Sequence, residues 1–348
     1  MSLVDELKSA VTPRAALLVV GVFALQLLFI ASYVGALHNP KPKDVPFGVA
    51  APPRVAAQLV GQLDQLPGEP LDARTLTDEA EAREQILNRE IDGALVVNAA
   101  GNTDTLLVAS GGGTVLSSAL NTLVTRIEAG GGRTVRTVDV APASPQDFDG
   151  LSAFYLVVGW CVGGYICAAI LAISAGSRPA NRERAIIRLG VLAVYAILGG
   201  LGGAVIVGPI LDALPGSVVA LWGLGALVVF AVGAITLALQ ALFGIVGIGL
   251  AILLIVVAGN PSAGGAFPLP MLPPFWKAIG PGLPPGAGTW VARSIAYFKG
   301  NDVTFSLLVL SAWAVVGSAI TLVMASLKRK PGTEPIAEEL GAAGGAAG

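Results

Sequence analysis

The distribution of apolar residues along the chain constrains its fold more than any other feature. One apolar stretch lies near the start, from Ala15 to Leu37, and the polar block 38–150 follows it. Further apolar stretches then succeed one another as far as Leu327. Because a bilayer core about 30 Å thick is crossed by a helix of about 20 apolar residues, each stretch is a candidate transmembrane helix. The layout predicts an α-helical polytopic membrane protein with one inserted domain.

Composition agrees with this fold class and narrows the function. The chain is 54% hydrophobic and 13% charged, whereas soluble domains carry about 25% charged residues. With 21 Lys and Arg against 23 Asp and Glu, no nucleic-acid partner is expected. Cys161, Cys167 and His38 are too few for a disulfide framework, an imidazole metal site or Ser-His-Asp chemistry. We expect no cofactor in this chain and no enzymatic activity.

Six transmembrane helices are predicted. They are placed at 15–37, 151–175, 187–208, 217–239, 241–258 and 303–327. Val34-Gly35-Ala36 resembles a signal-peptide cleavage site, but the first stretch is longer than a signal-peptide core and favours a permanent helix. Only Gln240 and small residues separate the fourth and fifth helices, so one long kinked helix is the alternative to a tight hairpin.

Orientation follows from the basic residues that flank the apolar stretches. They fall in three places: Lys8 and Arg14; Arg178, Arg182, Arg184 and Arg188; and Lys328, Arg329 and Lys330. Six helices put all three places on one side, as the positive-inside rule requires for the cytoplasmic side. We therefore predict a plasma-membrane protein with both termini cytoplasmic and 38–150 external. Residues 1–14 are predicted as a cytoplasmic amphipathic helix and 328–348 as a disordered cytoplasmic tail.

The block 38–150 alternates between strand-like and helix-like patterns. Strands are predicted at 45–52, 70–77, 93–99, 105–110 and 134–142, and helices at 53–66, 78–90 and 114–129. Thr77 is a candidate N-cap of the second helix, and the loop containing Gly101 and Asn102 favours a hairpin. This order is typical of a small α/β domain with a mainly parallel sheet. Gly111 to Gly113 lack the lysine of a phosphate-binding loop and are interpreted as ordinary loop glycines.

The segment 260–302 combines many prolines with aromatic residues. Short helices that dip into the outer leaflet and pack on protein fit this composition, and a proline-rich surface loop is the alternative. The residues singled out in this re-entrant segment are Pro273, Pro274, Phe275, Trp276, Trp290, Arg293 and Tyr297. Gly159 with Gly163, and Gly199 with Gly203, indicate close helix packing, either within the bundle or between subunits. Charged residues are nearly absent from the apolar stretches, which argues against proton or sodium coupling.

Two long stretches carry a resemblance to a known family. VPFGVAAPPRVAAQLVGQL followed by LTDEAEAREQILNREIDGALVV is similar to the external domain of the phage-infection-protein-like branch of type-2 ABC exporter permeases. LPPFWKAIGPGLPPGAGTWVARSIAYFKGN is similar to the segment before the last transmembrane helix of that branch. The overall layout of one helix, an external α/β insertion and five further helices also resembles these permease subunits.

The resemblance implies a homodimeric translocation unit powered by a separate ATPase that docks between the second and third helices. In this chain the corresponding candidates are Arg178, Arg182, Glu183, Arg184 and Arg188. The positive-inside rule alone explains the same arginines. The uncharged bundle favours an amphipathic or lipid-like substrate. The alternative function is a non-transporting membrane scaffold or receptor whose external domain binds an envelope partner.

Overall fold

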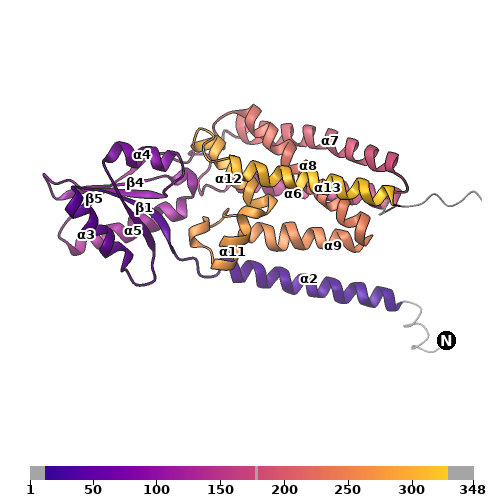
Figure 1. Cartoon of the computed structure of the whole chain (residues 1–348), viewed down its shortest axis with the longest axis horizontal. Coiled ribbons are helices and arrows are strands. Elements are labelled where there is room, and N and C mark those ends of the chain that lie inside the picture. The colour runs from indigo at the N-terminus through magenta and orange to yellow at the C-terminus, as the bar shows by residue number, and fades with distance from the viewer. Residues whose placement is uncertain (1–11, 177–178, 328–348) are drawn as a thin grey trace, which may run out of the picture.

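The computed structural model describes residues 12–176 and 179–327. Arg178, the tail 328–348 and most of the amphipathic helix predicted at 1–14 lie outside the described residues. Figure 1 shows an elongated molecule with two parts. An α/β domain forms one end, and long helices running along the molecular axis form the other.

Five helices in the described part are long and apolar enough to cross a membrane. They are α2 (Pro13–Leu37), α6 (Ser152–Ala175), α7 (Arg182–Val205), α8 (Val218–Phe243) and α13 (Thr304–Ser326). In α7 the apolar stretch continues through the π-helical turn η2 (Ile206–Ile210). The described chain is thus a helical membrane protein by length and composition of its helices.

A sixth apolar helical stretch follows α8 and is shorter than the other five. It consists of α9 (Val246–Ile252), η3 (Leu253–Gly259) and α10 (Asn260–Ser262). The chain reverses at Gly244, whose φ of 65° is accessible to glycine. The long kinked helix is therefore wrong, and so is the predicted turn at Gln240, which lies fully buried inside α8.

Glycine also sets the spacing of this hairpin. A Cβ at Gly247 would lie 2.5 Å from the main-chain nitrogen of Gln240, so the backbones of α8 and α9 are in close contact.

The beginning of α2, the connection between α6 and α7, and the end of α13 all lie at the end of the helical part away from the α/β domain (Figure 1). Those are the places where the sequence carries its basic residues.

Helix α8 lies at the centre of the helical part, packed against α6, α7 and α13. The Trp160 side chain of α6 fits over glycines of two neighbours: a Cβ at Gly225 would lie 2.6 Å from its ring. Its Nε1 donates to the carbonyl of Gly199 over 3.2 Å. Gly203 also packs on this ring, and Gly163 on Tyr195, so both glycines serve packing within the bundle.

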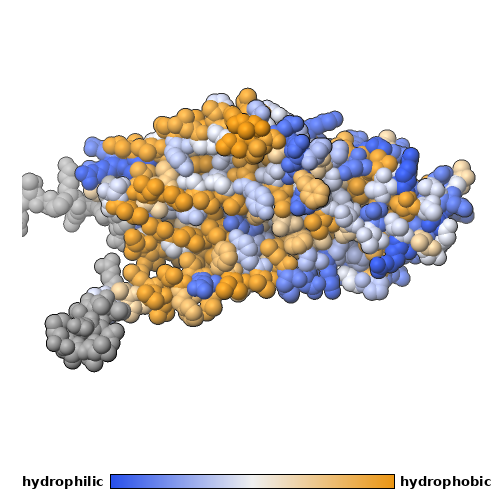
Figure 2. All heavy atoms as spheres, turned by 180° about the vertical axis from the view of Figure 1, so that it is seen from behind, coloured by the Kyte–Doolittle hydropathy of each residue, from blue (hydrophilic) through white to orange (hydrophobic). Residues whose placement is uncertain are grey.

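The outer surface of the helical part is apolar, whereas the α/β domain is mostly hydrophilic (Figure 2). Helix α2 is the most exposed of the long helices, and its main contacts are with η3 and α10. Leu17 and Val22 of α2 are 72% and 65% exposed. Such a surface is stable only against lipid or another apolar surface.

The α/β domain is built on a five-stranded sheet in the order β2-β1-β3-β4-β5. The strands are β1 (Val45–Ala50), β2 (Leu71–Leu76), β3 (Gly93–Val96), β4 (Thr103–Val108) and β5 (Thr134–Asp139). The helices are α3 (Pro53–Asp64), α4 (Glu79–Leu87) and α5 (Thr114–Gly130), with the short η1 (Ser110–Gly112) before α5. Only the β3–β4 pair is antiparallel, which confirms the predicted hairpin in a mainly parallel sheet.

One local prediction in this domain is wrong. The N-cap of α4 is Asp78, whose side chain accepts a hydrogen bond from the Glu81 N–H. Thr77 instead donates from its main-chain nitrogen and its hydroxyl to the Glu81 carboxylate. A carboxylate is the better cap here because it also complements the helix dipole.

The segment between α10 and α13 forms short helices packed on protein, as predicted. They are η4 (Leu269–Met271), α11 (Pro274–Ile279), η5 (Gly280–Gly282) and α12 (Pro284–Tyr297). Most residues of α12 are buried, and α12 packs against α6, α8 and α13. We call residues 263–303 the outer segment. It lies between the helical part and the α/β domain (Figure 1).

Candidate functional site

The loop after α4 forms the contact between the α/β domain and α12 of the outer segment. Helix α4 ends at Leu87 and is capped by Asn88, and Arg89 follows with a φ of 64°. This left-handed conformation is common after a helix but costs a non-glycine residue about 1 kcal/mol. The Arg89 guanidinium lies 3.3 Å from the Trp290 ring centroid. Its Nη1 donates to the Trp290 carbonyl over 2.9 Å and to Ser294 Oγ over 2.6 Å, and these contacts offset the backbone strain.

Arg293 fixes the outer segment from inside. Its side chain is buried, and Nη1 donates to the Gly264 carbonyl over 2.7 Å. Nη2 donates to the carbonyls of Gly265 and Gly150 over 2.7 and 3.0 Å. The guanidinium therefore joins α12, the loop before η4 and the start of α6. Its Nε has no hydrogen-bond partner among the described residues.

Further contacts hold the α/β domain against the outer segment, and we call this region of contact the joint. Tyr297 Oη donates to Asp147 Oδ2 over 2.8 Å, and Asn301 Nδ2 donates to the Leu87 carbonyl over 3.0 Å. The glycines before α5 allow the domain to come this close. A Cβ at Gly111 would lie 2.7 Å from Tyr297 Cβ, and one at Gly113 would overlap the Pro268 ring.

A cavity of about 280 Å³ lies within this joint, and we call it the junction cavity. The α/β domain contributes residues 89–92 together with Pro46 and Gly112. The outer segment contributes Pro268, Leu269, Trp290 and Arg293, and the first turn of α13 contributes Phe305 and Ser306. Its wall combines apolar side chains with charged groups of both signs, the composition typical of a site for a small amphipathic molecule.

The charged groups of the cavity perturb one another. Burial, together with the nearby Arg293, lowers the pKa of Arg89 to about 9, so Arg89 stays protonated at neutral pH. Burial raises the pKa of the Asp92 carboxyl to about 6, against the pull of Arg89 and Lys277. Asp92 consequently loses part of its negative charge in mildly acidic solution.

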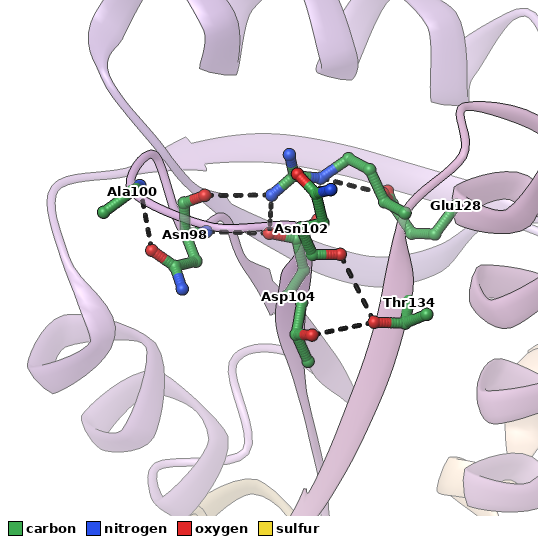
Figure 3. A network of polar contacts seen from close by, with 8 residues as sticks. Asn98, Ala100, Asn102, Asp104, Glu128 and Thr134 are labelled. Carbon is green, nitrogen blue, oxygen red and sulfur yellow. Dashed lines mark hydrogen bonds and ion pairs between the residues drawn. The ribbon is translucent and has the colours of Figure 1, made fainter.

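A second polar cluster lies at the other end of the sheet, around the β3–β4 loop (Figure 3). Asp104 is fully buried and forms an ion pair with Arg133, which also lies 3.7 Å from Glu128. Burial would raise the pKa of Asp104, but hydrogen bonds from Arg133 and Asn98 hold it below its usual range. Burial raises the pKa of Glu128 to about 7, and the adjacent Asp104 adds to this effect. Because its groups are satisfied by one another, we interpret the cluster as structural.

The predicted residues of the outer segment separate into two groups. Trp290, Arg293 and Tyr297 meet at the joint, and the first two line or border the junction cavity. Pro273 and Pro274 begin α11, where Phe275 and Trp276 form an edge-to-face pair with centroids 5.1 Å apart. Phe275 is 63% exposed, so this pair belongs to the surface of the protein.

The predicted docking residues lie at the opposite end of the molecule, at the start of α7. Arg182, Glu183 and Arg184 are exposed, and Asn181 caps the helix by accepting from the Arg184 N–H. Arg188 is buried, and its Nη2 donates to the Gly176 carbonyl over 2.8 Å. Arg188 thus supports the connection between α6 and α7, while the first turn of α7 forms its accessible surface.

Sequence reasoning missed Arg89 and Asp92. Arg89 falls at the end of the helix predicted at 78–90, where an arginine is usually a solvated surface residue. In the part of the chain that the structure describes, no group of three His, Cys, Asp or Glu could hold a metal ion. Comparisons with protein families, with curated proteins and with solved structures find no match to this chain.

Proposed function

We propose that this chain is the membrane-embedded translocation subunit of an exporter for an amphipathic or lipid-like substrate. In this proposal six helices cross the plasma membrane, both ends of the chain face the cytoplasm, and the α/β domain is external. The observation that carries the proposal is the junction cavity, an amphipathic site next to the outer ends of uncharged apolar helices.

The composition of the helices supports a passive translocation unit. The stretches 15–37, 152–174, 189–210, 218–243, 246–262 and 304–326 contain no Asp, Glu, Lys, Arg or His. Carriers driven by ion gradients use such residues inside the membrane. Transport through this chain then needs energy from a separate polypeptide, and an ATPase is the partner that the family resemblance suggests.

The basic end of α7 is the proposed ATPase contact. Arg182, Glu183 and Arg184 are exposed in its first turn, whereas Arg188 is buried and serves the helix connection. We propose further that two copies of the chain form the working unit, with apolar faces such as that of α2 covered by the second copy or by lipid.

Copurification tests whether the chain is coupled to a separate ATPase. The full chain is purified in mild detergent from the cells that naturally express it, and ATP hydrolysis in the preparation is measured. Arg182→Ala combined with Arg184→Ala should remove most of the copurifying hydrolysis. Arg126→Ala, an exposed arginine of α5, is the matched control and should leave it unchanged. Absence of any copurifying ATPase from the wild-type preparation would contradict the proposal.

A scaffold or receptor function is the second candidate, and one observation favours it. Only residues 176–181 connect α6 with α7, which is short for a separate coupling helix. In that case the α/β domain binds an envelope partner while the helices serve as an anchor. Deletion of residues 41–146 distinguishes the two functions: a receptor would lose partner binding, whereas an exporter would lose substrate efflux.

A further inference from the structure

We propose that the junction cavity binds the phosphate-bearing head group of a lipid-like amphiphile, with Arg89 and Arg293 as its anion-binding side chains. The inference depends on the proposed function only in naming this ligand a transport substrate. The binding site itself serves a receptor equally well.

The first argument concerns the two arginines. Both line the cavity, and they come from different parts of the chain, Arg89 from the α/β domain and Arg293 from α12. Among the residues described, neither has a carboxylate within ion-pair distance. Buried charges in proteins are normally paired. Two guanidiniums that share one cavity without such a partner therefore constitute a site for an external anion.

Unused hydrogen-bond donors give the second argument. All hydrogen bonds of Arg89 to described residues come from Nη1, which leaves Nε and Nη2 for a ligand. Arg293 Nε is buried and has no partner in the described part of the chain. Guanidinium N–H groups match phosphate oxygens in geometry and charge. The site thus offers donors from two arginines to one anion.

The acidic residues of the cavity do not cancel this charge. Glu90 lies 3.7 Å from Arg74 with a half-exposed side chain, and Asp302 is exposed to solvent. Asp92 is the remaining carboxyl, and its raised pKa of about 6 shows that ionisation is unfavourable there. Arg89 and Lys277 act on this carboxyl, and Arg293 lies near Arg89, so three cations surround the cavity.

The position and the volume of the cavity indicate that its ligand is an amphiphile rather than a free anion. Phe305 and Ser306 belong to the first turn of α13, so the cavity lies beside the outer end of an apolar helix. Phe305 is 60% exposed and can contact an acyl chain that leaves the cavity along α13. The volume of about 280 Å³ is at the lower limit for small-molecule sites. It fits a head group but not a complete lipid, whose chains would stay in the bilayer.

The test is equilibrium binding to the purified full chain in nonionic detergent. The probe is a short-chain phosphatidylglycerol. Phosphatidylcholine with the same chains and glycerol phosphate without chains are the comparison ligands. We expect phosphatidylglycerol to bind at least about tenfold more tightly than either. Equal binding of phosphatidylcholine would overturn the charge argument, and equal binding of glycerol phosphate would overturn the lipid argument.

Variants assign the binding to the cavity. Arg89→Gln removes the charge and should weaken phosphatidylglycerol binding by about tenfold or more, while Arg89→Lys should retain part of it. Arg83→Gln, on the helix that precedes Arg89 and paired with Glu79, is the matched control and should bind normally. Ser306→Leu fills the cavity but leaves the charge of both arginines unchanged, and it should also abolish binding.

Thermal unfolding of each variant shows that it is folded. Normal binding by folded Arg89→Gln and Ser306→Leu would refute the site. Because no ATP or transport is involved, failure of the exporter proposal leaves this result unaffected, and the reverse also holds.

Discussion

At the scale of single residues, the buried Glu128 makes the α/β domain sensitive to pH. Its pKa is about 7 in the folded state against an ordinary value of 4.5. A raised pKa means that the folded state binds the proton more tightly, so this contribution to stability is complete below about pH 4.5. It is lost as pH rises through 7. Asp104 has a lowered pKa and acts in the opposite direction, but at lower pH.

We therefore expect the wild-type domain to lose about 1–3 kcal/mol of stability between pH 5 and pH 8 relative to Glu128→Gln. This loss of stability is measured by hydrogen exchange of β4 and α5 in the full chain. The rates are corrected for the intrinsic pH dependence of exchange. Glu79→Gln removes an exposed carboxylate and is the control. A pH profile of Glu128→Gln that parallels the wild type would show that Glu128 is not the responsible group.

Asp92 should control head-group binding in the junction cavity. At pH 7.5 its carboxylate repels an anion, and as the pH falls through 6 it becomes increasingly neutral. Phosphatidylglycerol keeps its single charge over this range, so its affinity should rise several-fold from pH 7.5 to pH 5. Asp92→Asn should bind tightly at both pH values. Glu90→Gln should retain the wild-type pH dependence, since Glu90 lies near Arg74. A pH-dependent Asp92→Asn would contradict this assignment.

At the scale of elements, the glycines before α5 determine how the domain meets the outer segment. A Cβ at Gly111 would press on Tyr297, which cannot move freely because it is bonded to Asp147. A Cβ at Gly112 would be in ordinary contact, 3.4 Å from Phe298. Gly111→Ala should therefore destabilise the joint by about 1–3 kcal/mol, and Gly112→Ala should do so by much less.

Hydrogen exchange at residues 88–92 and 294–301 reports on this joint. Faster exchange in Gly111→Ala together with unchanged exchange in Gly112→Ala is the expected result. If both variants behaved alike, close approach at Gly111 would not be the reason for the glycine. Gly111→Ala should also weaken phosphatidylglycerol binding more than Gly112→Ala does, because the joint forms the cavity.

Elements with a strong local pattern were predictable from the sequence. The five strands and three helices of the α/β domain follow the alternating and helical patterns closely, since local burial determines them. The turn after α8 was placed four residues early because Gln240 is polar, although the chain reverses at Gly244. A single buried glutamine inside an apolar helix has no local pattern that distinguishes it from a turn.

The candidate site was only half predictable for a related reason. Trp290 is recognisable because aromatic residues stand out in a proline-rich segment, and Arg293 is a candidate only as a member of that segment. Arg89 and Asp92 come from a stretch about two hundred positions earlier, and their role depends on docking between distant parts of the chain. Nothing in the local sequence encodes that contact.

At the scale of the whole molecule, the two ends of the long axis can be labelled separately. The β3–β4 loop and the first turn of α7 lie at opposite ends of the long axis (Figure 1). Asn102 is exposed in that loop, and Glu183 is exposed on α7. The proposed topology, with six crossings and basic residues inside, places Asn102 outside the cell and Glu183 in the cytoplasm.

Single cysteines at these two positions test the orientation, with Cys161 and Cys167 replaced by alanine. In intact cells, Asn102→Cys should react with a membrane-impermeant thiol reagent, whereas Glu183→Cys should react only after permeabilisation. Labelling of both in intact cells would mean that the first turn of α7 is external, so that no cytoplasmic ATPase could contact it. The reverse pattern would invert the molecule and place the junction cavity at the inner leaflet, where an exporter would collect its substrate rather than release it.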